Sequence, residues 1–390
     1  MSTPGVSQRA AAMEPFRVMQ VLARAQALEA PGRDVIHLEV GEPDFPTPEP
    51  IVAAATRAMA AGMVRYTPAH GTSALRKAIA GDYLRLYGLR VDPERVVVTS
   101  GASAAILLAL AAGTDAGDAV LLPDPGYACN RQFVTALGGQ PVPVPVPAQS
   151  GFQPTATQIA AAWRPGTRAV MLASPANPTG TLLPEAELTA IAEVVRERNG
   201  MLIMDEIYGR LIFDRPPVTA LSTVPDAIIV NSFSKYYAMT GWRLGWMVVP
   251  EDWIEPVRRL AQNLFVAPPT VAQTAALAAF ESGTETLLQA RVRELQARRD
   301  FLLAALPGLG LELHARPEGA FYIYADSRAH GSDSEALCAR ILDEAGVALT
   351  PGTDFSPGSG RDHIRIAYTQ PRERLEEAVA RLRPVLAGHT

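Results

Sequence analysis

Short apolar runs alternate with longer stretches of helical character through the middle of this chain, and this alternation limits the folds open to it. The runs occupy 96–99, 119–122, 169–173, 201–204, 227–230 and 244–249, and the run 227–230 is rich in β-branched residues. Runs of this length, bounded by turn residues, predict buried strands. Because helical stretches separate several of them, we expect a mainly parallel sheet with helices on both faces.

The two flanks of this region have a different character. Prolines at every second position from 141 to 147 predict an edge strand or an extended surface segment, since proline lacks a backbone donor. The N-terminal part predicts an arm, a helix ending at the turn Pro31-Gly32, and a short strand from Val35 to Val40. After about residue 283, a long helix, a helix near 334–345, the strand HIRIAYT and a closing helix at 371–387 predict a smaller α+β unit.

Composition excludes several classes of function. A formal charge of −5 over 390 residues argues against nucleic acid or an anionic membrane as a partner. Two cysteines and six scattered histidines support neither a disulfide framework nor a metal site. Neither a signal-peptide pattern nor an apolar run of about 18 residues is present, so we expect a cytoplasmic protein without a membrane span.

Lysine occurs only twice among 35 basic residues, at Lys77 and Lys235. Lys77 follows Arg76 on a predicted helix and is expected at the surface. Lys235 follows the apolar run 227–230, in the stretch NSFSKYYAMTGWRLGW. Lysine can form an imine with a carbonyl, whereas arginine cannot. A surface turn would explain Lys235 equally well, but Ser232 and Arg243 nearby suit a group that carries both a carbonyl and a phosphate, as pyridoxal phosphate does.

Two more strand ends carry residues that fit this cofactor. Asp205, in MDEIYG, ends a buried strand, where a carboxylate needs a cation such as a protonated pyridine nitrogen. Tyr208 could then reach the neighbouring ring oxygen, although Asp205 could instead cap the following turn. Asn177, in SPANPTG, could donate to the ring oxygen from a tight turn that a cis proline would fix.

The remaining candidates are individually weak. The motif SGAS places Ala102 and Ser103 at the start of a buried helix, where backbone amides suit a phosphate, although many helices begin with serine only as a cap. Tyr127, in PDPGYA, could stack on a planar ring or could pack under a loop. Open α/β sheets bind ligands at the carboxyl ends of their strands, so we expect all these side chains at one site.

In the order of its motifs the chain closely resembles the class I/II aminotransferases of pyridoxal-phosphate fold type I, over nearly its whole length. The motifs are GEPDF, RYTPAHG, SGAS, PGY, SPANPTG, DEIYG, SFSKYYAMTGWRLG, PEGAFY and IRIAY. The resemblance implies a large cofactor-binding domain at 46–282 with a mainly parallel seven-stranded sheet, and a smaller α+β domain formed by 1–45 and 283–390.

The resemblance also implies a homodimer with shared active sites, in which Tyr66 reaches the phosphate of the partner subunit's cofactor. Gly41, Asn177 and Arg365 are implied to bind the substrate α-carboxylate. Without the resemblance, Arg365 would be interpreted as a surface arginine on a strand.

The implied reaction is a ping-pong transfer of an amino group from an L-amino acid to a 2-oxo acid, through an internal aldimine at Lys235. Lys235 would move the Cα proton, while Asp205 keeps the ring nitrogen protonated. A carbon–sulfur lyase or related eliminase could use the same residues. A transcription regulator with this fold would need a DNA-binding domain, for which the roughly 40 residues before Gly41 leave no room.

The identity of the substrate stays open at this point. The stretch QNLFVAPPTVAQ, at 262–273, has Phe265 and Pro268-Pro269 where the resemblance leads us to expect a more polar sequence, and this departure argues against a strictly dicarboxylic substrate. A broad or apolar preference is one alternative, and aspartate bound through a mobile arginine such as Arg17 is another.

Overall fold

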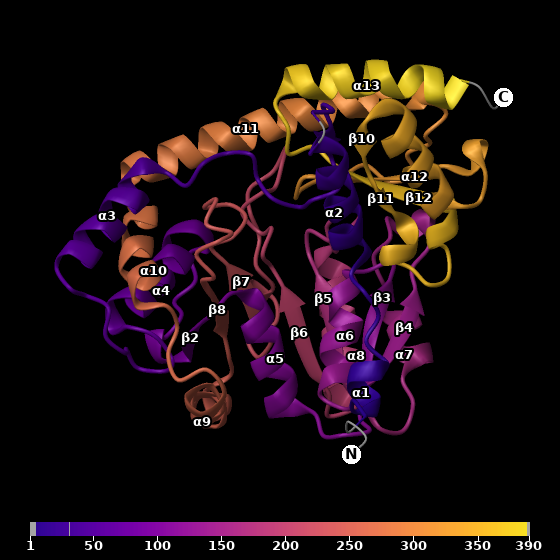
Figure 1. Ribbon diagram of the computed structural model, residues 1–390. Coiled ribbons are helices and arrows are strands. Elements are labelled where there is room, and N and C mark those ends of the chain that lie inside the picture. Colours follow the sequence, from indigo (N-terminus) through magenta and orange to yellow (C-terminus); the bar gives the residue numbers. More distant parts are fainter. Residues whose placement is uncertain (1–4, 31, 388–390) are drawn as a thin grey trace.

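The computed structural model describes residues 5–30 and 32–387, so Pro31 of the expected turn lies outside the described residues. Its centre is a seven-stranded sheet in the order β2-β8-β7-β6-β5-β3-β4 (Figure 1). The strands are β2 (Val96–Thr99), β3 (Ala119–Asp124), β4 (Gln140–Pro145), β5 (Thr167–Ala173), β6 (Met201–Asp205), β7 (Ile228–Ser232) and β8 (Gly245–Val248). Only β8 runs antiparallel to its neighbours, which confirms the mainly parallel sheet.

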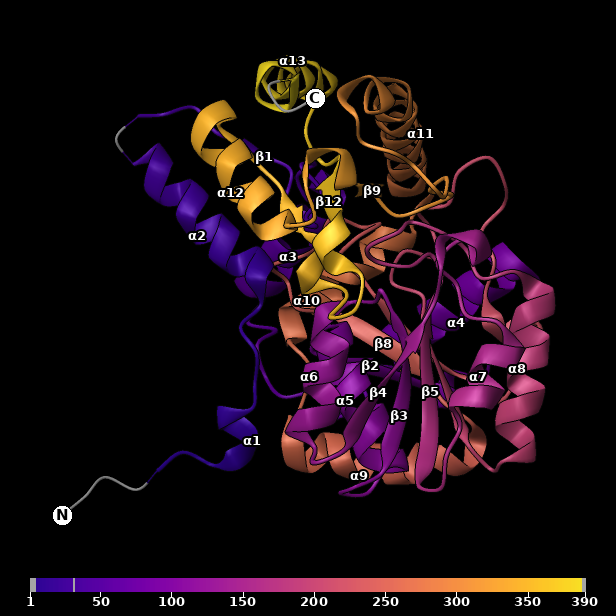
Figure 2. The same cartoon turned by 90° about the vertical axis from the view of Figure 1, so that its right-hand side faces the viewer.

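Helices cover both faces of this sheet, as Figure 2 shows from the side. One face carries α5 (Ala102–Gly113), α6 (Ala128–Ala136) and α9 (Ile254–Leu264), and the other carries α4 (Ser73–Tyr87), α7 (Ala156–Ala162) and α8 (Glu185–Glu197). Alternate strand residues point to opposite faces, so Ile203 packs in the cluster of α5 while its neighbour Met204 packs in that of α4 and α8. Burial on both faces explains the continuous apolar runs.

The proline-rich segment forms β4, at one edge of the sheet, with β3 as its neighbour. This position confirms the expected edge strand. An edge strand needs partners on one side only, so the missing backbone donors of its prolines can face away from the sheet.

The C-terminal part forms an antiparallel sheet in the order β11-β12-β9, packed with helices. Its elements are α11 (Ser282–Ala305), β9 (Tyr322–Asp326), α12 (Ser334–Ala345), β10 (Val347–Ala348), β11 (Thr350–Pro351), β12 (His363–Ala367) and α13 (Arg372–Ala387). In Figure 1, α11 and α13 lie together above the large sheet, whereas α2 (Arg17–Glu29) approaches from the N-terminal arm. The described part of the chain also contains α1 (Gln8–Ala11), α3 (Glu49–Ala60) and α10 (Thr270–Ala276).

The strand expected from Val35 to Val40 is wrong in extent, because β1 covers only Ile36–His37, paired with β10. Beyond it the carbonyls of Glu39 and Val40 accept hydrogen bonds from the side chains of Arg365 and Thr369 rather than from a neighbouring strand. Tertiary side-chain contacts therefore replace the strand ladder at this point.

No helix in the described ranges has the length and apolarity that crossing a membrane requires. We propose that the seven-stranded and the three-stranded sheet mark two domains, with residues 46–282 forming the larger one and residues 1–45 and 283–390 the smaller one.

Candidate active site

The carboxyl ends of the central strands open into a cavity of about 290 Å³. Every predicted site residue except Tyr66 lines it: Gly41, Ala102, Ser103, Tyr127, Asn177, Asp205, Tyr208, Ser232, Lys235, Arg243 and Arg365. Tyr66 lies outside the cavity, and its side chain is 86% exposed. Segments separated by more than 300 residues thus contribute to one site.

Lys235 projects into this cavity from the loop after β7. Its Nζ donates to the carbonyl of Gly41 at 2.6 Å. Burial lowers the pKa of Lys235 from 10.5 to about 8, and the nearby positive charges of Arg365 and Arg243 act in the same direction. A substantial fraction of this amine is therefore neutral at mildly alkaline pH, as a nucleophile or a general base must be.

Asp205 ends β6 and lies deep in the cavity. Its Oδ1 accepts from the backbone N–H of Ile207 at 3.1 Å. Burial raises the pKa of Asp205 from 3.8 to about 6, so ionising this carboxyl is costly without a cation beside it. The protonated nitrogen of a pyridine ring would supply that cation.

Tyr208 makes its polar contact with a residue that the sequence did not assign to the site. Its hydroxyl lies 2.8 Å from the hydroxyl of Tyr322, on β9, in the motif PEGAFY. A Cβ at Gly41 would lie 1.8 Å from the same Tyr322 oxygen. Glycine is therefore required at position 41 by the close approach of a tyrosine, in addition to any contact with a ligand.

Arg365 is 2% exposed, and its hydrogen-bond partners among the described residues are all neutral. The guanidinium donates to Asn177 Oδ1 at 3.0 Å, to the carbonyl of Glu39, and to Thr350 Oγ1 at 3.3 Å. Its Nε has no hydrogen-bond partner within the described ranges. A buried cation without an anionic partner is stabilised when an anion binds beside it, and a carboxylate matches the geometry of the guanidinium.

The contact with Arg365 also fixes the orientation of Asn177. Arginine has only donors, so Asn177 must present its oxygen, which leaves its NH₂ group available as a donor. The Asn177-Pro178 peptide is cis, in line with the turn considered from the sequence.

The amino end of α5 and the guanidinium of Arg243 form the cationic end of the cavity. Gly101 precedes α5 with φ 85°, and a Cβ there would lie 2.6 Å from Arg243 Nη2. Helix amides and an adjacent guanidinium suit a phosphate. The Ser232 oxygen already accepts from the backbone N–H of Ser234 at 2.9 Å, so it also shapes the loop before Lys235.

Phe16, at the start of α2, and Val18 and Met19, in its first turn, form part of the cavity wall together with Ile106 of α5. Phe16 packs edge-on against Tyr127, with ring centroids 6.0 Å apart. No motif marked these residues, because an ordinary amphipathic helix start has the same pattern. Only the path of the chain brings them to the site.

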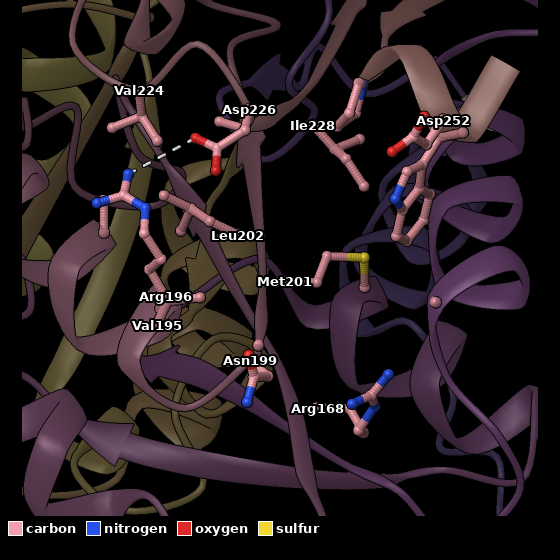
Figure 3. A pocket seen from close by; sticks show the side chains of 16 residues that line it. Arg168, Val195, Arg196, Asn199, Met201, Leu202, Val224, Asp226, Ile228 and Asp252 are labelled. Atoms are coloured by element: carbon pink, nitrogen blue, oxygen red, sulfur yellow. Dashed lines mark ion pairs between the residues drawn. The ribbon is translucent and has the colours of Figure 1, made fainter.

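A second cavity, of about 430 Å³, lies at the amino ends of β5, β6 and β7 (Figure 3). Arg168, Met201 and Ile228 line it, and Arg196 pairs with Asp226 at 3.8 Å. Its lining includes none of the predicted site residues. The chemistry expected from the motifs therefore belongs to the cavity at the opposite end of the sheet.

Comparisons with known proteins agree with this geometry. The family model for aminotransferase class I and II matches residues 33–382. The valine–pyruvate aminotransferase of Mycobacterium tuberculosis is 42% identical over 374 residues, which cover 95% of this chain and 96% of that protein.

Solved structures extend the likeness to the fold. An aminotransferase from Mycobacterium tuberculosis has a TM-score of 0.95 at 41% identity, covering 99% of this chain and 100% of its own. Aspartate aminotransferase from Thermus thermophilus, solved with maleate, has a TM-score of 0.92 at 35% identity, covering 98% and 100%. The chain therefore belongs to the class I and II aminotransferases, which depend on pyridoxal phosphate and transfer amino groups between amino acids and 2-oxo acids.

Proposed function

We propose that this aminotransferase takes its amino group from L-amino acids with apolar side chains. The supporting observation is the cavity wall formed by Phe16, Val18, Met19 and Ile106. The cations that line the cavity are Lys235, Arg243 and Arg365, each of which has another role below. A dicarboxylic substrate would need a further cation.

Arg17, the mobile arginine considered above, makes its contacts elsewhere in this structure. Its Nε lies 3.1 Å from a carboxylate oxygen of Glu335, and Arg17 lines a groove against α12 instead of the active-site cavity. The name of the related valine–pyruvate aminotransferase is in keeping with an apolar donor.

Each predicted residue has a proposed task in the reaction. Arg365 and Asn177 bind the α-carboxylate, beside Gly41, and thereby orient the Cα–H bond. Asp205 holds a proton on the ring nitrogen, Tyr208 and Asn177 donate to the ring oxygen, and Tyr127 packs against the ring. Ala102, Ser103, Ser232 and Arg243 hold the phosphate, and Tyr66 of the partner subunit completes that site.

Pyridoxal phosphate, when bound, supplies the carbonyl that takes up the amino group and the ring that accepts the electron pair. Lys235 supplies the proton transfer: its amine takes the proton from the substrate Cα. Its lowered pKa, about 8, allows the amine to accept and return a proton near neutral pH.

We also propose a homodimer with shared active sites. Exposed apolar side chains occur on two adjacent segments, joined where Thr270 Oγ1 donates to the carbonyl of Arg65 at 2.6 Å. These side chains are Met59, Met63, Val64, Tyr66, Leu264 and Val266. We propose that a second copy covers these side chains and places its own Tyr66 at this cavity. The two free cysteines suit the proposed cytoplasmic location.

A donor screen tests the proposal, with valine, leucine, phenylalanine and aspartate each paired with pyruvate and 2-oxoglutarate. We expect the apolar donors to have the higher kcat/KM, and Lys235→Ala to abolish turnover. A preference for aspartate would refute the substrate assignment. Release of hydrogen sulfide, ammonia and pyruvate from cysteine, without amino transfer, would instead favour the lyase.

Matched variants test the apolar wall directly. Met19 lines the cavity, whereas the next residue, Gln20, lines the groove against α12. Met19→Arg should raise the kcat/KM ratio of aspartate to valine by about tenfold, by placing a cation at the side-chain pocket. Gln20→Arg adds the same charge elsewhere and should leave the ratio unchanged. Equal effects of the two variants would contradict the assignment of the wall.

A further inference from the structure

We propose that Glu39, anchored by His37, is a positioning residue that holds Arg365 in place for the substrate carboxylate. The inference rests on the function proposed above. Neither Glu39 nor His37 lines the active-site cavity, so any effect they have on the reaction must pass through other residues.

The side chain of Glu39 is fully buried. Its Oε1 lies 2.7 Å from His37 Nδ1, and its Oε2 has no hydrogen-bond partner in the described part of the chain. Burying a carboxylate with one oxygen unpaired costs stability that an apolar side chain would not. Packing alone therefore gives no reason for a glutamate at this position.

The hydrogen bonds of the Glu39 main chain give a reason for a glutamate at this position. Its carbonyl accepts hydrogen bonds from Arg365 Nη2 and from Thr350 Oγ1, the latter at 3.0 Å. Because the side chain and the carbonyl share one Cα, anchoring the carboxylate restricts rotation of the backbone that carries the carbonyl. Two residues later, the carbonyl of Gly41 accepts from Lys235. The Glu39 carbonyl thus holds Arg365, whereas Lys235 has a separate acceptor at Gly41.

His37 is the anchor for this arrangement. Its second ring nitrogen, Nε2, lies 3.2 Å from Glu29 Oε1, at the end of α2. The hydrogen bond and charge of Glu39, together with those of Glu29, raise the pKa of His37 to about 9. The ring is therefore a cation at neutral pH and donates to the carboxylates on both sides.

Glu39→Gln tests the role, because it keeps the shape and an acceptor oxygen but removes the charge that His37 holds. We expect the KM of the amino donor to rise about tenfold, with kcat within about threefold of the parent value. The Kd of isovalerate, a carboxylate without an amino group, should rise by the same factor in the holoenzyme. The visible absorption of the bound cofactor should be unchanged, because Lys235 and Asp205 keep their places.

Glu29→Gln is the matched control, because it removes the exposed partner of His37 and leaves Glu39 in place. It should change KM and the isovalerate Kd by less than about twofold. If Glu39→Gln does not fold, His37→Gln, which retains a donor, should show a smaller rise in Kd than His37→Ala.

Three results would overturn the inference: an unchanged isovalerate Kd in Glu39→Gln, equal effects of Glu39→Gln and Glu29→Gln, or a loss of kcat alone. In the fallback pair, equal Kd values for His37→Gln and His37→Ala would do the same. A parent enzyme that binds isovalerate but transfers no amino group would refute the proposed function and not the positioning role, since binding is measured without turnover.

Discussion

Asp205 should destabilise the folded protein whenever the cofactor is absent. Burial raises its pKa from 3.8 to about 6, so the folded state binds more protons than the unfolded state between these values. The stabilising contribution of the protonated carboxyl is full below pH 3.8 and is lost as the pH rises through 6. At about 1.4 kcal/mol per unit of pKa difference, the ionised carboxylate costs about 3 kcal/mol at pH 7.5.

Asp205→Asn removes this cost and keeps an oxygen for the N–H of Ile207, which donates to Oδ1 at 3.1 Å. We therefore expect the cofactor-free variant to gain up to about 3 kcal/mol in free energy of unfolding at pH 7.5. Most of the gain should disappear at pH 4. Urea unfolding of parent and variant at matched protein concentration measures both values, since the proposed dimerisation would make stability depend on concentration.

The holoenzyme should behave in the opposite way. A neutral amide cannot hold a proton on the ring nitrogen, so pyridoxal phosphate should stabilise Asp205→Asn less than it stabilises the parent, and turnover should fall by orders of magnitude. If Asp205→Asn showed no gain at pH 7.5, or an equal gain at pH 4, burial of the ionised carboxylate would not be the source of the instability.

Three further predictions concern other parts of the site. Arg365→Lys should raise the KM of donor and acceptor by about 100-fold in steady-state assays, because lysine cannot contact both Asn177 and the substrate carboxylate as arginine does. Arg361→Lys, at an exposed arginine, is the control. An unchanged KM in Arg365→Lys would contradict the role of Arg365 in binding the carboxylate. Gly41→Ala should lower kcat/KM at least tenfold, because the added Cβ would collide with the Tyr322 hydroxyl. Adding Tyr322→Phe to the same chain should restore part of the lost kcat/KM. If the double variant shows no such recovery, the collision is not the cause of the loss. Refolding Tyr66→Ala and Lys235→Ala proteins together, each inactive alone, should recover about a quarter of parent activity. Half of the dimers would then contain one subunit of each variant, and each such dimer would have one intact site out of two. No recovery would exclude a site shared between subunits.

The sequence alone was sufficient to locate the central strands and the chemical groups at their ends. The strand at Val96–Thr99 and the helix beginning at Ala102 lie where the pattern predicted them, because apolar periodicity and turn residues are local signals. Lys235, Asp205 and Asn177 could be grouped from their places after predicted strands, since parallel strands deliver their carboxyl ends to one edge of a sheet. The predicted extent of the strand at residues 35–40 was wrong, because the carbonyls of its last two residues accept hydrogen bonds from side chains far away in the sequence.

Contacts between distant segments were decided only by the tertiary structure. Tyr322 approaches Gly41, and the Glu39 carbonyl accepts a hydrogen bond from Arg365. The apolar wall joins Phe16 and Met19 to Ile106, so each of these contacts brings together separate parts of the chain. Such pairs leave no periodic or compositional mark, because each residue by itself suits an ordinary loop, strand or helix. The sequence by itself therefore determined the pyridoxal-phosphate chemistry of the site and left an aminotransferase and a lyase open, because both reactions use the same residues. The path of the chain decided how Arg365 and Lys235 are held.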